Sequence, residues 1–210
     1  LPTSTFFNLR PEKQERLLTA AAREFAAQPF HEASINSMIR AAGIPRGSFY
    51  MYFRDKEDLF RYLVQESIQE LLVVFEEILR GRNGDVFAAL PDMYDYLRSH
   101  PATDCGLGGP GMMSAIVNRN GGLQKGGLLE FVEPELILER MEDCVNPDLL
   151  DLREPEDLGY ILRTLIILAV PVMYNGLRPG ADPDGRKRLE RVLQIVRRGM
   201  GAKPASAQQK

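Results

Sequence analysis

The stretch SINSMIRAAGIPRGSFYMYFRDK, Ser34 to Lys56, decides the fold of this chain, because it predicts two short helices joined by a tight turn. Ser34 is a good N-cap for the first helix, since its side-chain oxygen can accept a hydrogen bond from an open backbone N–H group. Gly43 ends that helix because it has no Cβ to oppose a positive φ. Pro45 is then a favourable first residue for the second helix. The pattern predicts a helix–turn–helix.

The second helix of this pair carries a surface that is unusual for a helix facing water. Phe49 and Phe53 stand at an i, i+4 spacing, so both rings are expected to face inward. The outward residues include a cation, a glycine, hydroxyls and apolar bodies, but no carboxylate: Arg46, Gly47, Ser48, Tyr50 and Met51. Such a surface suits close contact with a phosphate backbone, and the second helix of a helix–turn–helix enters the major groove of DNA.

The segment AGIPRGSFYMYFRDKEDLF closely resembles a signature of the tetracycline-repressor (TetR) family of bacterial regulators, A-G-[VI]-x-[KR]-G-[ST]-[LF]-Y-x-[YH]-F-x-x-K-x-x-L. The resemblance covers about the first sixty residues. Pro45 and Ile39 depart from the pattern, and Pro45 lacks a hydroxyl and an N–H that could have met a phosphate. The matching positions are Ala42, Gly43, Ile44, Arg46, Gly47, Ser48, Phe49, Tyr50, Tyr52, Phe53, Lys56 and Leu59.

The resemblance implies an all-α fold, with an N-terminal three-helix helix–turn–helix DNA-binding domain and a larger α-helical domain for ligand binding and dimerisation. It implies a dimeric, ligand-responsive transcriptional repressor that binds a pseudo-palindromic operator in double-stranded DNA and is released by a small apolar effector. The alternative is a non-regulatory or architectural DNA-binding protein. An enzyme is disfavoured, because His31 and His100 are the only histidines and no acid–base constellation is visible.

We assign eight residues to the DNA-binding surface: Ser34, Arg46, Gly47, Ser48, Tyr50, Met51, Tyr52 and Lys56. Arg46 is the best candidate for a base edge or a neighbouring phosphate. Hydroxyls at Ser48 and Tyr50 are expected to hold phosphates, as are Tyr52 and Lys56. Gly47 allows a close backbone approach, and Met51 can meet a thymine methyl group. Packing in the core is an equal alternative for Tyr52.

The charge of the chain is distributed in the way that a DNA-binding front domain requires. The net charge is −3, but residues 1–61 hold nine Lys/Arg against seven Asp/Glu, whereas the remainder holds 17 against 22. The segment from Arg40 to Lys56 contains four cationic residues and one acidic residue, Asp55. The basic character is therefore local to the predicted helix–turn–helix.

Helical periodicity continues through most of the chain and no convincing strand appears. The long helix carries its apolar stripe past the end of the front domain, so it is expected to connect two domains. We expect domains at 1–56 and 57–200, with a tail of disordered composition at 201–210. The expected helices are 11–27, 35–42, 45–53, 55–79, 85–100, 112–117, 128–144, 156–175 and 186–198.

The helix at 156–175 is apolar on nearly every side, which predicts that it is buried all round. Since its own core can cover only one side, a second copy of the chain is expected to cover the other. The last two helices then form a four-helix dimer interface. The residues assigned to it are Leu165, Leu168, Leu189, Val192, Leu193 and Val196.

An apolar effector site is expected between the middle helices, with an inducer that is lipid-like or aromatic. Eight glycines between Gly106 and Gly127 suit a lid that opens, and Pro171 would free the carbonyl of Ile167 at the pocket wall. Filling of the core is an equal alternative for any single lining residue. The candidate lining is Met93, Tyr94, Leu97, Met112, Met113, Phe131, Ile166, Val170 and Tyr174.

The remaining features exclude several classes of protein. Cys105 and Cys144 have no metal-ligand spacing, and neither a metal nor a cofactor is expected. Two free thiols in a reducing cytoplasm are favoured over the alternative, a disulfide. No signal peptide is visible, and no apolar stretch reaches the roughly 18 residues needed to span a bilayer. Two roles fit the N-terminal arm LPTSTFFNL. Docking of Phe6 and Phe7 on the domain is favoured over entry into the minor groove, because the arm lacks cations.

Overall fold

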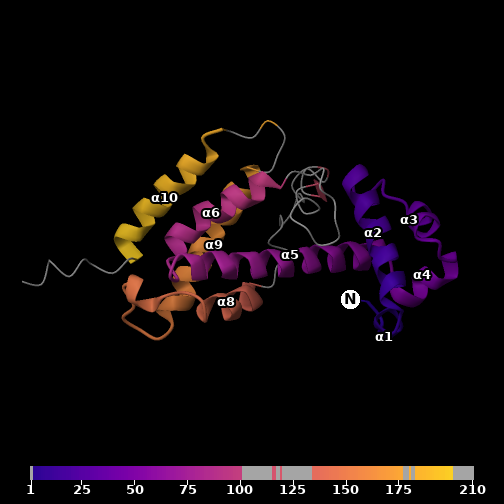
Figure 1. Cartoon of the computed structure of the whole chain (residues 1–210), viewed down its shortest axis with the longest axis horizontal. Helices are drawn as coiled ribbons and strands as arrows, with labels where there is room; N and C mark the ends of the chain where they lie inside the picture. The colour runs from indigo at the N-terminus through magenta and orange to yellow at the C-terminus, as the bar shows by residue number, and fades with distance from the viewer. Residues whose placement is uncertain are drawn as a thin grey trace, which may run out of the picture. The chain divides into compact units, whose positions relative to one another are not determined.

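The computed structural model describes residues 2–100, 115–116, 119, 134–176, 180 and 183–200, and this part of the chain is helical, with no β-strand (Figure 1). The helices are α1 (Ser4–Phe7), α2 (Pro11–Ala27), α3 (Ile35–Ala42), α4 (Arg46–Tyr52), α5 (Lys56–Gly81), α6 (Val86–Ser99), α8 (Pro134–Glu142), α9 (Asp157–Gly176) and α10 (Gly185–Met200), with a short 3-10 turn, η2 (Pro147–Leu149). The all-α class predicted from the sequence is confirmed.

The chain divides into two compact units. Unit 1 comprises residues 1–71 and 100–132, and unit 2 comprises residues 72–99 and 133–210. The division falls inside α5, which therefore contributes its first part to unit 1 and its last part to unit 2. The functional boundary expected after residue 56 stays a prediction.

A cluster of aromatic rings lies in the core of unit 1, supplied by α1, α2, α4, α5 and the residue that follows α4. Phe53 lies with its ring centroid 5.0 Å from that of Phe6 and 6.0 Å from that of Phe49. Phe25 and Phe60 meet edge to face at 4.9 Å. Edge-to-face and tilted ring pairs of this kind add to the stability that burial alone supplies.

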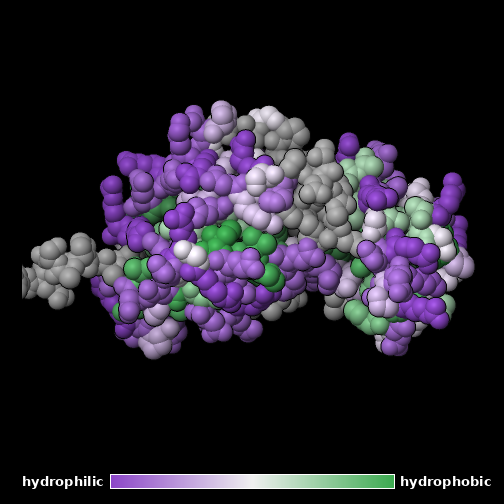
Figure 2. All heavy atoms as spheres, in the orientation of Figure 1, coloured by the Kyte–Doolittle hydropathy of each residue, from purple (hydrophilic) through white to green (hydrophobic). Residues whose placement is uncertain are grey.

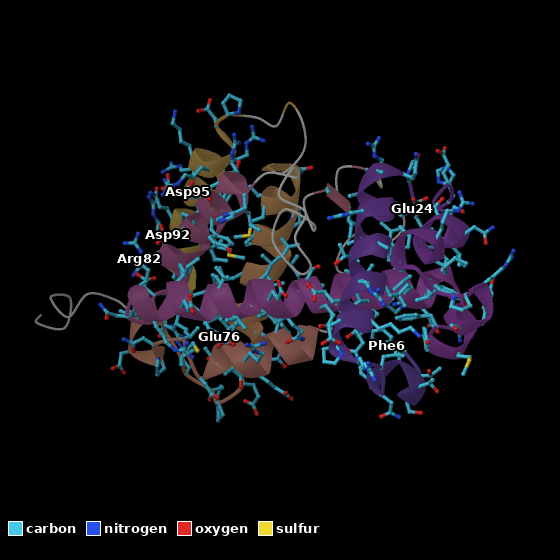
Figure 3. The ribbon with its side chains drawn as sticks, turned by 45° about the vertical axis from the view of Figure 1, so that its right-hand side comes forward. Phe6, Glu24, Glu76, Arg82, Asp92 and Asp95 are labelled. Atoms are coloured by element: carbon cyan, nitrogen blue, oxygen red, sulfur yellow. The ribbon has the colours of Figure 1, made fainter. Side chains whose placement is uncertain are left out.

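Unit 2 is a helical layer in which α6 packs against both α9 and α10, and α8 packs against α9. Ion pairs brace its surface, among them Arg82 with Asp92 and Arg186 with Asp95, at 2.5 Å and 2.7 Å (Figure 3). On the face shown in Figure 2, apolar side chains gather in one area of a mainly hydrophilic surface of unit 2. The described helices lack the length and apolar character that crossing a membrane requires.

Helix α9 is covered by its own chain on one side only, since Tyr160 and Ile167 are 68% and 62% exposed. The expectation that a second copy covers this other side stays a prediction. The other expected helices agree with α2, α5, α6, α9 and α10 to within two residues at each end. The helix expected at 128–144 is described only as α8 from Pro134 onward, and nearly all of the segment 112–127 lies outside the described residues.

Candidate nucleic-acid interface

The turn between α3 and α4 follows the local chemistry of its residues. The Ser34 side chain accepts a hydrogen bond from the Ser37 N–H at 3.4 Å, while the Ser34 N–H donates to Glu24 on α2 at 2.9 Å (Figure 3). Gly43 has a φ of +65° and ends α3 in the left-handed conformation that glycine adopts without strain. The Ile44 N–H then donates to the Ile39 carbonyl at 3.0 Å, which closes the turn.

Helix α4 packs against the core of unit 1 with its apolar side, and its other side is exposed. Pro45 is the N-cap, with φ −62° and ψ 145°, so the helix begins one residue later than predicted. Phe49 is fully buried, whereas Arg46, Tyr50 and Met51 are exposed, Met51 by 57%. Gly47 is also exposed, with no atom within 4 Å of the place a Cβ would take, and Ser48 is half-buried. The outward surface inferred from the spacing is therefore present.

Tyr52 belongs to the core rather than to this surface. Its side chain is 4% exposed, its ring centroid lies 6.5 Å from that of Phe6, and the Lys13 ammonium lies 5.7 Å from it. Of the two alternatives for Tyr52, packing is the one that the structure shows. The reason is long-range, because the ring that covers Tyr52 comes from the N-terminal arm.

Lys56 has partners within its own unit. Its ammonium donates to the carbonyls of His31 and Ala33 at 3.2 Å and 2.9 Å and lies 4.9 Å from the Phe30 ring centroid. These bonds tie the first turn of α5 to the segment between α2 and α3. The phosphate contact predicted for Lys56 has to compete with them.

The charges around α4 are not equally available to a ligand. Arg54 is paired with Asp55, and their hydrogen bond raises the pKa of Arg54. Asp55 also accepts the Asp58 N–H at 2.8 Å, which caps α5 and lowers the pKa of Asp55. Arg40 and Arg46 are exposed, and within the described residues neither pairs with a carboxylate. Arg40 was not among the eight residues predicted to bind DNA, although its place in the last turn of α3 was the available signal.

A groove in unit 1 has too balanced a charge to favour binding of phosphate. This groove of about 1000 Å³ runs along α2 and α3. Four cations and three carboxylates line it, so its charge is nearly balanced: Arg10, Lys13, Arg16, Arg23, Glu12, Glu15 and Glu24. Elsewhere in the described parts of the chain, no group of His, Cys, Asp and Glu side chains could hold a metal ion.

The residues predicted to line an effector site are only partly described. Met93, Tyr94, Leu97 and Ile166 are buried and Val170 is half-buried, but Met112, Met113 and Phe131 lie outside the described residues, as does the side chain of Tyr174. The Tyr94 ring lies against Gly176 and Gly185, at the end of α9 and the start of α10. Pro171 and Ile167 are exposed residues of α9. The carbonyl predicted at a pocket wall stays a prediction.

The groove that the structure does show in unit 2 lies between α6 and α10 and holds about 300 Å³. Its floor is apolar, with Phe87, Pro91 and Leu193, and none of the predicted lining residues contributes to it. Arg82 and Arg186 stand at its rim, where both are paired with carboxylates.

The predicted dimer residues divide into two groups. Leu165, Leu189 and Leu193 are buried within their own unit, because α9 and α10 turn these side chains toward each other and toward α6. Assigning them to a dimer interface is therefore wrong. Leu168, Val192 and Val196 are half-buried. The apolar side chains that these helices leave exposed are Tyr160 and Ile167 on α9 and Ile195 on α10.

Comparison with known proteins agrees with this geometry. The family model for bacterial regulatory proteins of the tetR family matches residues 17–63. The uncharacterized HTH-type transcriptional regulator YdgC of Bacillus subtilis is 37% identical over 68 residues, which cover 32% of this chain and about a third (35%) of YdgC. The HTH-type transcriptional repressor Rv1474c of Mycobacterium tuberculosis is 27% identical over 185 residues, which cover 88% of this chain and 90% of that protein.

A solved structure extends the likeness of the fold to the whole chain. The fatty acid degradation regulator FadR of Bacillus halodurans superposes with a TM-score of 0.55 at 16% identity, covering 97% of this chain and 100% of that one. At this level of identity the likeness concerns the fold alone. Together with the family match and the geometry of α3 and α4, it leads to one conclusion. Residues 17–63 form a domain of the tetR family of bacterial regulatory proteins, and α3 and α4 are the helix–turn–helix of this domain.

Proposed function

We propose that this chain is a cytoplasmic, dimeric transcriptional repressor that binds a pseudo-palindromic operator and is released from it by a small apolar effector. The observation that carries the proposal is the outward side of α4. It exposes Arg46, Gly47, Tyr50 and Met51 without a carboxylate, while Phe49 anchors the opposite side. The relatives support repression, since Rv1474c and AcnR of Corynebacterium diphtheriae are both named repressors and each match covers about nine-tenths of the relative.

The proposed contacts with DNA follow from these exposures. Arg46 at the start of α4 reaches a guanine edge or a phosphate, because its fork of N–H donors fits both. Tyr50 bonds a phosphate through its hydroxyl, and Met51 packs against a thymine methyl group. Exposed Arg40 adds a further cation at the end of α3. Two such units, related by a two-fold axis, would enter successive major grooves about 34 Å apart.

The proposed dimer interface uses the apolar side chains that α9 and α10 leave exposed. Tyr160 and Ile167 are seven residues apart, so they lie on one side of α9. Ile195 is exposed on α10, which packs against α9. Because apolar surface shared by two packed helices can be covered by the same surface of a second copy, these two helices with their counterparts form the proposed four-helix contact.

The effector proposal rests on unit 2 alone. Met93 and Leu97 on α6 and Ile166 on α9 are buried apolar side chains on helices that pack together. A bound apolar molecule would shift DNA affinity only by preferring one arrangement of these helices over another. Release of DNA by such a molecule separates this proposal from the alternative, a DNA-binding protein without regulation.

The proposal is tested by selection of bound duplexes from a random-sequence pool, followed by titration of the selected duplex at several salt concentrations. A steep salt dependence and a selected sequence with two related half-sites are expected. Titration of medium-chain fatty acids and of polycyclic aromatics into the complex then tests for release. The absence of any enriched sequence after repeated selection would overturn the proposed function.

A further inference from the structure

The recognition helix α4 is too short to be stable by itself. It has seven residues, whereas isolated helices need about 12 to 15 residues to be even marginally stable in water. The carbonyls of its last turn also lack partners within the helix. The Phe49 carbonyl accepts the N–H of Phe53, the C-cap residue, at 2.9 Å. The stability of this end of α4 therefore depends on groups from outside it.

Thr3 supplies two of the missing partners. Its backbone N–H donates to the Tyr52 carbonyl at 2.9 Å, and its hydroxyl donates to the Met51 carbonyl at 2.6 Å. One residue of the N-terminal arm thus satisfies two successive carbonyls at the C-terminal end of α4. Such bonds hold a helix end against fraying in the way that a C-cap does.

The arm is itself held in place by α2 and by the core of unit 1. Phe6, labelled in Figure 3, is 1% exposed, and its ring centroid lies 5.0 Å from that of Phe53 and 5.5 Å from that of Tyr62. The amide nitrogen of Gln14 on α2 lies 3.0 Å from the Phe6 carbonyl and 3.2 Å from the Leu9 carbonyl. The arm therefore connects α2 to the far end of α4.

We infer that Thr3 is a positioning residue for DNA recognition, which holds the end of α4 in the conformation that enters the major groove. This inference rests on the proposed function. The arm residues 2–9 carry no charged side chain, so the arm has no cation to offer a phosphate. Its contribution to affinity comes from raising the fraction of molecules in which α4 is intact before DNA arrives. When that fraction falls, the apparent affinity falls by the same factor.

Thr3→Val tests the inference, because valine keeps the shape of threonine and loses the hydroxyl donor. Amide hydrogen exchange of the free protein is measured at Tyr52 and Phe53, together with affinity for the duplex selected by the wild type. Loss of one hydrogen bond predicts exchange about two- to tenfold faster at these amides, and a measurable loss of affinity that does not exceed the same factor. Exchange in the middle of α2 should not change.

Two variants control for the substitution itself. Thr3→Ser keeps a hydroxyl and is expected to behave as the wild type. Thr5→Val makes the same chemical change two residues away, at an exposed side chain without a hydrogen bond among the described residues, and is expected to change neither measurement.

The outcomes separate this inference from the proposed function. Unchanged exchange at Tyr52 and Phe53 in Thr3→Val overturns the inference, because the arm then does not hold α4. Faster exchange with unchanged affinity also overturns the inference, because the contact of Thr3 with α4 would then have no role in DNA recognition. A wild type that binds no selected duplex overturns the proposed function and the positioning role together, while the exchange rates still report whether the arm holds α4.

Discussion

The corner between α9 and α10 depends on two glycines that accommodate the ring of Tyr94, and this arrangement predicts a specific pattern of stability changes. A Cβ at Gly176 would lie 2.5 Å from Cε2 of Tyr94 and 2.8 Å from both Cζ and the hydroxyl oxygen. A Cβ at Gly185 would overlap mainly the Tyr94 hydroxyl oxygen, with Cζ next at 3.3 Å. Because Tyr94 is buried, its ring cannot move aside without displacing neighbours.

Each glycine-to-alanine change should therefore be destabilising. Overpacking of this kind costs about 1–3 kcal/mol, and the better helix propensity of alanine returns at most about 1 kcal/mol. Both glycines are terminal residues of their helices, so this return is smaller than in a helix interior. We expect a net loss of about 1–2 kcal/mol in the free energy of unfolding for Gly176→Ala and for Gly185→Ala.

Tyr94→Phe distinguishes the two sites. Removing the hydroxyl relieves the overlap at Gly185, where the next atom is 3.3 Å away, but leaves the ring carbon at 2.5 Å from a Cβ at Gly176. By itself, Tyr94→Phe loses the hydrogen bond from Arg98 (3.4 Å), which costs about 0.5–1.5 kcal/mol. In a double-mutant cycle we expect a favourable coupling of about 1 kcal/mol between Tyr94→Phe and Gly185→Ala. The coupling with Gly176→Ala should be smaller, because Cε2 at 2.5 Å and Cζ at 2.8 Å remain after the hydroxyl oxygen, also at 2.8 Å, is removed.

The measurement is urea unfolding of all variants at one protein concentration, because the stability of a dimer depends on concentration. Gly199→Ala is the matched control on α10, with nothing within 4 Å of its Cβ position, and it is expected to be neutral or stabilising by up to about 1 kcal/mol. Equal coupling at both glycines, or no loss of stability in Gly185→Ala, would refute this account of the corner.

The other predictions concern the interface, the dimer and the start of α5. Arg46→Ala should weaken binding to the selected duplex by about 1–3 kcal/mol and relax its sequence preference, measured by gel shift against random duplexes. Ile167→Arg should give monomers by light scattering that stay folded by circular dichroism, and a dimeric Ile167→Arg would contradict the proposed interface. Leu193→Arg changes a side chain that is 2% exposed, so it should unfold unit 2. Lys56→Met should lower the free energy of unfolding by about 1–2 kcal/mol, because its hydrogen bonds to two backbone carbonyls are lost. If Lys56 contacts a phosphate instead, the slope of the logarithm of DNA affinity against the logarithm of salt concentration should become shallower by about one. The pKa of Asp55 is lowered in the folded protein, so the stability that its charge contributes is present above its unfolded pKa of about 4 and is lost as the pH falls through the lower folded pKa. Asp55→Asn keeps a capping oxygen but has no charge to lose. In urea unfolding, this variant should therefore lose less stability than the wild type between about pH 7 and about pH 3.

The helix–turn–helix could be predicted from the sequence because its rules are local. The cap at Ser34, the left-handed turn at Gly43 and the inward pair Phe49 and Phe53 each depend on residues no more than four positions apart. The outward surface of α4 followed from the same spacing. The effector site could not be predicted from such local rules. A buried apolar residue such as Met93 gives the same sequence pattern whether its side chain faces a ligand or the protein's own core.

The sequence by itself determined that the chain is all-α and where its recognition helix lies, since capping and periodicity act within a few residues. Only the tertiary structure decided the partners of ambiguous side chains. Tyr52 is buried because the arm brings Phe6 over it, and Lys56 is engaged because the segment around His31 passes beside it. An apolar stripe shows that a helix has a covered side, but not what covers it. Leu193 is covered by the core of its own unit, whereas Ile167 on the neighbouring helix is exposed.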